Sequence, residues 1–98
     1  MASCYIIYSK TIDSYYIGST NTDVSLRIIK HNEKYYGAKK FSRQAIDWIL
    51  ILEIKCKNMK QASLIEHHIK KMKSRMYIKN LCQYMEMQKK LHEKYSDS

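Results

Sequence analysis

The chain contains no proline, and its two glycines are Gly18 and Gly37. Linkers and low-complexity stretches are usually rich in such residues, so the sequence indicates one continuous unit without repeats. Its 98 residues suit one hydrophobic core, because a domain commonly takes about 100–150 residues. We therefore expect a single domain over residues 1–98.

The charge balance points to a polyanionic partner. The chain has 18 Lys and Arg against 9 Asp and Glu, a formal net charge of +9, and a pI near 9.5. Such basic domains are typical of nucleic-acid binders. Hydrophobic residues make up 45% and aromatic residues 11% of the chain, more than a disordered chain carries, so the charge belongs to a folded domain.

The apolar runs and the cysteines bear on the cellular location. The longest apolar runs, 4–8 and 48–52, fall far short of the roughly 18–20 residues that span a membrane, and no secretory signal is visible. We expect a cytoplasmic protein without membrane association. Cys4, Cys56 and Cys82 are widely spaced, which favours reduced structural thiols over disulfides or a zinc site.

Residue patterns at the start of the chain predict a β-hairpin and a helix. Segments 4–10 and 15–19 are rich in β-branched and aromatic residues, and the polar residues 10–14 connect them. From residue 23 to about 34 the pattern becomes helical, with Asn21 or Thr22 as the N-cap.

The second half predicts one strand and two helices. A strand over 47–54 is followed by a helix that Asn58 caps and by another helix from about 76 to 92. The expected fold class is α+β, a small three-stranded antiparallel sheet flanked by helices in the order β-β-α-β-α-α.

The first helix carries two residues suited to phosphodiester chemistry. Arg27 and His31 share one side with Val24 and Ile28. A guanidinium there could stabilise charge on a phosphodiester, and the imidazole could move a proton. The alternative is a half-exposed arginine with a neighbouring surface histidine.

The next helix carries a candidate metal ligand. Glu66 lies at the edge of the apolar stripe, so its carboxylate can reach over the sheet. Mg²⁺ or Mn²⁺ often uses only one or two carboxylates. The competing interpretation is an ordinary ion pair with Lys70 one turn later. His67 and His68 point about 100° apart and cannot chelate one ion together.

Two basic regions could contact nucleic acid. The segment 35–45 interleaves aromatic residues with Lys39, Lys40 and Arg43, a composition used to bind phosphates and stack on bases. The charge excess of the second half lies on its helices. A solvated loop and a helix coating that keeps the protein soluble explain the same residues.

Taken together, these residues resemble a known pattern. Tyr5 is followed eleven residues later by Tyr16-Ile17-Gly18, then by Arg27 and His31 on a helix, and by a distant Glu66. The chain resembles the GIY-YIG nuclease family over roughly residues 4–81, leaving a C-terminal helix and tail over 82–98. It looks closest to compact stand-alone bacterial members related to the amino-terminal nuclease domain of the excision-repair incision enzyme.

The resemblance implies a DNA phosphodiesterase that uses one divalent ion, Mg²⁺ or Mn²⁺, held by Glu66. Tyr5 is then a candidate general base, which requires a phenol pKa well below its usual value of about 10. Tyr16 would orient water or phosphate, and Arg27 would stabilise charge on the phosphorus. His31 could share the proton transfer, and the choice between Tyr5 and His31 stays open.

The resemblance also implies contacts with nucleic acid. The first motif reads Ser3-Cys4-Tyr5 in place of Gly-Ile-Tyr, so Tyr8 is an alternative to Tyr5, although its side chain should emerge on the opposite sheet face. The residues expected to contact DNA are Gly18, Lys39, Lys40, Arg43, Lys70, Lys73, Arg75 and Asn80.

We therefore expect a metal-dependent DNA endonuclease with structure-directed or weakly sequence-selective cutting, in DNA repair, recombination or mobile-element processing. The alternatives are a non-catalytic nucleic-acid-binding module with the same fold and a small basic interaction protein. The need for a protein partner, or for a second copy in a homodimer, stays open.

Overall fold

A computed structural model describes residues 2–33 and 46–96. Three antiparallel strands form one sheet: β1 (Ala2–Ser9), β2 (Ser14–Thr20) and β3 (Ile49–Cys56). Their order is β2-β1-β3, which makes β1 the central strand and β2 an edge strand among the described residues. The predicted hairpin and the α+β class are confirmed.

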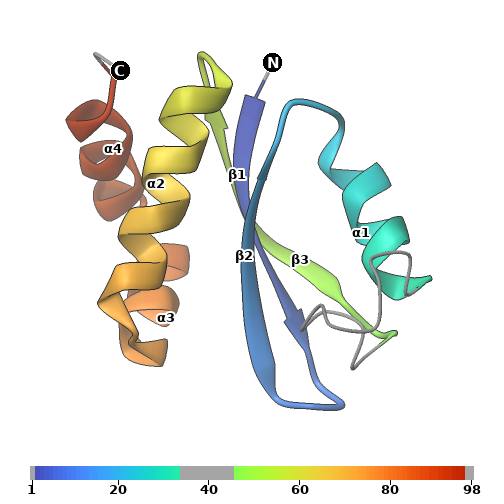
Figure 1. The fold of residues 1–98 in the computed structure, drawn as a ribbon. Helices are drawn as coiled ribbons and strands as arrows, with labels where there is room; N and C mark the ends of the chain where they lie inside the picture. The colour runs from blue at the N-terminus through green and yellow to red at the C-terminus, as the bar shows by residue number, and fades with distance from the viewer. Residues whose placement is uncertain (1, 34–45, 97–98) are drawn as a thin grey trace.

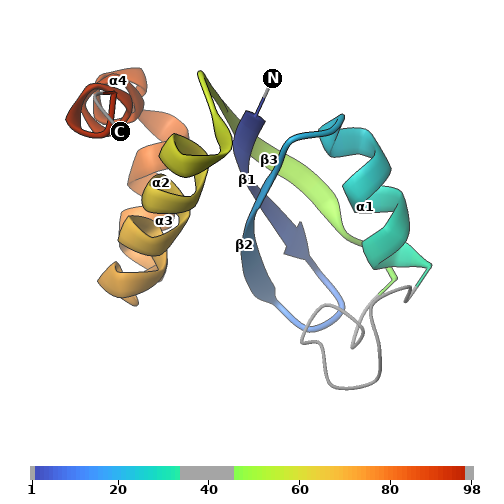
Figure 2. The same ribbon diagram turned by 45° about the horizontal axis from the view of Figure 1, so that its top comes forward.

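Four helices cover the two faces of this sheet. Helix α1 (Val24–Asn32) lies on one face, and α2 (Met59–Met72), α3 (Arg75–Gln83) and α4 (Met85–Lys94) lie on the other (Figures 1 and 2). In the parts of the chain that the structure describes, no helix is long and apolar enough to span a membrane.

Strand alternation divides the core between these two faces. On the α1 side, Tyr5 and Ile7 pack with Val24 and Trp48. The larger cluster on the other side is formed by residues of β1, β3, α2, α3 and α4, namely Ala2, Cys4, Ile6, Ile54, Cys56, Ala62, Ile65, Ile69, Ile78, Leu81 and Leu91. Consecutive residues of β1 therefore belong to different environments, and this decides which side chains reach α1.

The predicted caps of the first two helices fared differently. The Asn58 side chain caps α2 as expected, because it accepts a hydrogen bond from the backbone N–H of Gln61 at 2.8 Å. The N-cap of α1 is Asp23, not Asn21 or Thr22, and its carboxylate accepts from the N–H of Ser25.

The single helix predicted from about 76 to 92 is wrong, because the chain forms two helices there. Tyr84 has an extended backbone, with φ −109° and ψ 107°, and ends α3 just before α4 begins. The side chain of Gln88 donates a hydrogen bond to the carbonyl of Leu81 at 2.9 Å and so satisfies a carbonyl near the end of α3. Leu91 of α4 is buried in the core after this turn.

Candidate active site

Tyr5 and Gly18 are partners across β1 and β2 and lie in direct contact. A Cβ atom at Gly18 would lie 2.6 Å from the Tyr5 hydroxyl oxygen and 2.7 Å from Cζ, closer than real contacts allow. The ring of Tyr5 therefore occupies the space above the glycine backbone. Glycine is required here by this close approach.

The hydroxyl group of Tyr5 contacts His31 of α1. Its Oη lies 3.1 Å from His31 Nε2, within hydrogen-bond distance, and both side chains are almost completely buried. The half-buried ring of Tyr16 packs on the imidazole with ring centroids 4.7 Å apart. The structure thus brings three predicted residues of β1, β2 and α1 together.

The protonation of His31 is set by its surroundings. Burial, and then the nearby positive charge of Arg27, lower its pKa to about 4. Both effects disfavour the imidazolium ion. His31 is therefore neutral at neutral pH. Arg27 lies one helical turn earlier and is half-buried. His31 is buried, so the alternative interpretation of it as a surface histidine is wrong.

Tyr8 lies on the other face of the sheet, as predicted. Its ring packs on Tyr15 with centroids 5.0 Å apart, and its hydroxyl donates to a carboxylate oxygen of Asp13 at 2.5 Å. Tyr5 is therefore the tyrosine of this strand that faces α1.

Glu66 of α2 reaches the edge strand. Its Oε1 accepts a hydrogen bond from the hydroxyl of Ser19 at 2.5 Å, and its Oε2 pairs with Lys70 Nζ, also at 2.5 Å. The carboxylate thus reaches the sheet, as expected, and also forms the ion pair with Lys70; its role as a metal ligand stays a prediction. The sequence reasoning missed Ser19, although strand alternation after Gly18 places it on the α2 side.

The two groups of residues lie on opposite faces of the sheet. Helices α1 and α2 cover opposite faces of the sheet (Figure 1). Tyr5, Tyr16 and His31 belong to the α1 side, whereas Glu66 belongs to the α2 side. Edge strand β2 separates them, and its adjacent residues Gly18 and Ser19 contact one group each. The candidate site is therefore built around the exposed edge of β2.

The surroundings of Glu66 fit a hard divalent cation. The half-buried carboxylate and the hydroxyl of Ser19 supply oxygen atoms, which Mg²⁺ and Mn²⁺ prefer. The ammonium group of Lys70 already shows that a positive charge is accommodated on Oε2. Within the described ranges no group of three or more His, Cys, Asp or Glu residues could hold a metal, so Glu66 would act with water and substrate oxygens.

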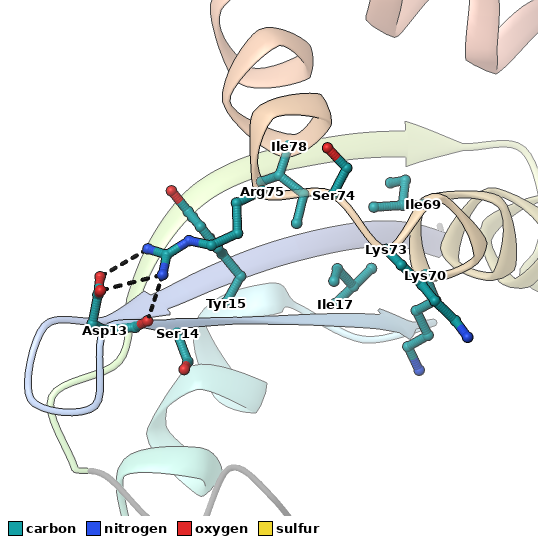
Figure 3. Close-up of a pocket in the computed structure, with 10 residues that line it drawn as sticks. All are labelled: Asp13, Ser14, Tyr15, Ile17, Ile69, Lys70, Lys73, Ser74, Arg75 and Ile78. Carbon is teal, nitrogen blue, oxygen red and sulfur yellow. Dashed lines mark hydrogen bonds and ion pairs between the residues drawn. The ribbon is translucent and has the colours of Figure 1, made fainter.

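A cavity of about 320 Å³ lies near Glu66, between β2, the end of α2 and the start of α3 (Figure 3). Lys70, Lys73 and Arg75 line it, as the prediction of a basic surface suggested. Arg75, however, turns toward Asp13: its guanidinium donates to both carboxylate oxygens, at 2.8 and 3.2 Å, and to the backbone carbonyl, at 3.1 Å. Arg75 therefore fastens the hairpin turn to α3.

The other predicted DNA contacts are placed as follows. Asn80 lies half-buried in α3. Lys39, Lys40 and Arg43 fall outside the residues that the structure describes. Roles in DNA binding for all of these residues, and for Gly18, stay predictions.

Comparison with known families agrees with this fold. The model of the GIY-YIG catalytic domain matches residues 1–80. The chain therefore belongs to the GIY-YIG family, a family of nucleases whose members generally use divalent metal ions, and the implied substrate is DNA. Searches of curated proteins and of solved structures gave no significant match.

Proposed function

We propose that this protein is a divalent-metal-dependent DNA endonuclease whose active site straddles the edge of β2. The observation that carries the proposal is the contact between Tyr5 Oη and the neutral His31 at 3.1 Å, beside Arg27 and Tyr16. This arrangement pairs a phenol with a proton acceptor in a buried setting. Such a pair can serve the general-base step of phosphodiester hydrolysis, in which the attacking water loses a proton.

Proton transfer falls to the Tyr5–His31 pair. Because His31 is neutral, it can accept the phenol proton of Tyr5 as Tyr5 takes a proton from the attacking water. The half-exposed Tyr16 orients the water or the phosphate, and Arg27 stabilises the negative charge that develops on the phosphate oxygens. The negative charge of a bound phosphate would offset that of Arg27 and so favour the proton on His31, from which it passes to solvent after cleavage.

Glu66 would hold the divalent ion at the other side of the β2 edge. Ser19 donates a hydrogen bond to one oxygen of this carboxylate, and the other oxygen, now paired with Lys70, would be the ligand. When bound, the ion supplies Lewis-acid stabilisation to the scissile phosphate and the leaving oxygen. A phosphate lying over the edge, beside Gly18, reaches residues from both faces. Lys70 and Lys73 then contact neighbouring phosphates.

Nicking of supercoiled plasmid tests the proposal. The purified chain is incubated with Mg²⁺, Mn²⁺ or EDTA, beside Glu66→Gln, His31→Gln and a matched control. Glu86→Gln on the exposed first turn of α4 removes the same charge without touching the site. We expect metal-dependent nicking that falls at least 100-fold in Glu66→Gln and is unchanged in the control.

Two results would contradict the proposal. Full activity of Glu66→Gln would show that this carboxylate takes no part in the reaction. If Glu53→Gln lost activity instead, the metal ligand would be Glu53, whose carboxylate accepts a hydrogen bond from Ser3 at 2.8 Å. Binding of DNA without cleavage under every condition would favour the non-catalytic module. Branched and flapped oligonucleotides in the same assay test the expected structure-directed cutting.

A further inference from the structure

The basic residues near the candidate active site are largely neutralised by carboxylates. In the described part of the chain two ion pairs form, Lys70 with Glu66 and Arg75 with Asp13. Both ion pairs lie where α2 and the start of α3 approach β2 and the turn before it. Lysines without a carboxylate partner among the described residues lie mainly on the outer side of α2 and on α4.

Two adjoining cavities lie between the outer side of α2 and α4. Their volumes are about 520 and 220 Å³, and both are lined by His68 and Lys94. Exposed lysines line this hollow, whereas no carboxylate of the described residues does. We call it the α2–α4 groove; its principal polar and aromatic residues are His68, Lys71, Tyr77, Lys90, Lys94 and Tyr95.

Three rings form a fixed cluster in the groove. The His68 Nδ1 and Tyr95 Oη atoms are 2.9 Å apart, and the two rings meet edge to face at 71°. The rings of Tyr77 and His68 also lie close together, with centroids 6.1 Å apart. All three side chains are half-buried. Such rings offer partly exposed surface at little cost in conformational freedom, because their positions are already fixed.

The electrostatic environment of the groove is positive. The pKa of His68 is lowered, first by burial and then by the charges of Lys94 and Lys71. The ring is therefore neutral at neutral pH and available for stacking. Lys94 Nζ also lies 5.8 Å from the centroid of the Tyr95 ring. No ion pair of the described residues occupies Lys71, Lys90 or Lys94.

We propose that the α2–α4 groove binds single-stranded nucleic acid. Lysines without carboxylate partners attract phosphates, while aromatic rings accept unpaired bases, and this combination is typical of single-strand binding. Base-paired duplex keeps its base faces stacked and has none to offer. The groove lies across α2 from Glu66, so under the proposed function it would hold an unpaired arm of a branched or flapped substrate.

Binding of a labelled 12-mer of thymidylate, followed by fluorescence anisotropy in EDTA, tests the groove without cleavage. The test variant is Lys90→Ala/Lys94→Ala, and the matched control is Lys57→Ala/Lys60→Ala, which removes two exposed lysines beside the start of α2. We expect the test variant to bind at least 10-fold more weakly. The slope of log K against log salt should fall by about 1.4, because each single-strand phosphate contact contributes about 0.7. The control should change both quantities much less.

Tyr95→Leu and Tyr95→Phe separate stacking from charge. Leucine should weaken binding several-fold while the salt slope stays unchanged, and phenylalanine, which keeps the ring, should restore most of the affinity. Circular dichroism establishes that each variant is folded. Equal losses in the two lysine pairs would overturn the proposal, as would equal competition by a 12-bp duplex or by polyglutamate, the latter indicating an acidic protein partner.

The outcome is independent of catalysis. The groove variant should nick supercoiled plasmid at the rate of the unmodified protein with Mg²⁺, while losing any preference for flapped oligonucleotides. Failure of the proposed function would leave the anisotropy result intact, whereas failure of the groove proposal would leave nicking intact.

Discussion

The ring of Tyr5 occupies the volume that a side chain at Gly18 would fill, so the two positions are sterically coupled across β1 and β2. This coupling fixes the Tyr5 hydroxyl against His31. The glycine therefore leaves room for the contact between Tyr5 and His31.

Substitution Gly18→Ala should displace Tyr5. The new methyl group meets the buried phenol ring, so we expect a loss of about 1–3 kcal/mol in the free energy of unfolding from overpacking, together with a large loss of nicking. Urea denaturation measures the first effect. In the double variant Gly18→Ala/Tyr5→Leu the clash is relieved, and stability should recover relative to the sum of the single changes. Strict additivity would contradict the coupling.

The stability of the fold should depend on pH through His31. Its pKa of about 4 in the folded state lies below the value of about 6.5 in the unfolded chain. Between these values the unfolded state binds more protons, so stability is full above pH 6.5 and falls as the pH drops toward 4. The loss should not exceed about 3 kcal/mol. Urea denaturation from pH 4 to 7.5 measures it, and in His31→Gln this part of the pH dependence should disappear.

Removal of the Ser19 hydroxyl should weaken metal binding while leaving Glu66 in place. Groups that orient a metal ligand commonly contribute 10–100-fold to affinity, and we expect a loss in this range for Ser19→Ala. Electron paramagnetic resonance of Mn²⁺ reports free and bound ion directly. Ser14→Ala, on the same strand but bonded to the carbonyl of Ile12 at 3.1 Å, is the control. Equal Mn²⁺ affinity in all three proteins would exclude a positioning role for Ser19.

The side chain of Asn32 joins the end of α1 to the start of β3. It accepts from the N–H of Trp48 at 2.7 Å and donates to its carbonyl at 3.1 Å. Asn32→Ala leaves a part-buried backbone N–H and carbonyl without these partners, so the protein should lose about 1–3 kcal/mol of stability. Thermal unfolding followed by circular dichroism measures the loss. Asn21→Ala, at an exposed position, should have little effect, and equal losses in both variants would contradict the argument.

Much of the fold could be predicted because its signals are local. Segments rich in β-branched and aromatic residues define the hairpin, and the cap at Asn58 lies beside the helix it starts. The break at Tyr84 could not be predicted, because an extended residue between two helical segments depends on how α3 and α4 pack on the core. The local residue pattern therefore predicted one helix where the chain forms α3 and α4.

The candidate site was only partly accessible to sequence reasoning. Helical periodicity placed Arg27 and His31 on one face, yet only the structure shows that His31 is covered by Tyr5 and Tyr16. The bond between Ser19 and Glu66 joins residues 47 positions apart. This bond forms because β2 is an edge strand beside α2. The order of strands in a sheet depends on contacts between distant parts of the chain, so local patterns do not predict it.

The single tryptophan lies beside the candidate active site, so its fluorescence can serve as a probe of that site. Trp48 is almost completely buried and meets the ring of Tyr16 edge to face, with centroids 6.3 Å apart. Tyr16 in turn packs on His31. The tryptophan fluorescence of the chain therefore originates beside the proposed Tyr5–His31 pair and on the opposite face of the sheet from the α2–α4 groove. Emission from the unlabelled protein can thus follow events at one side of the sheet while a labelled oligonucleotide follows those at the other.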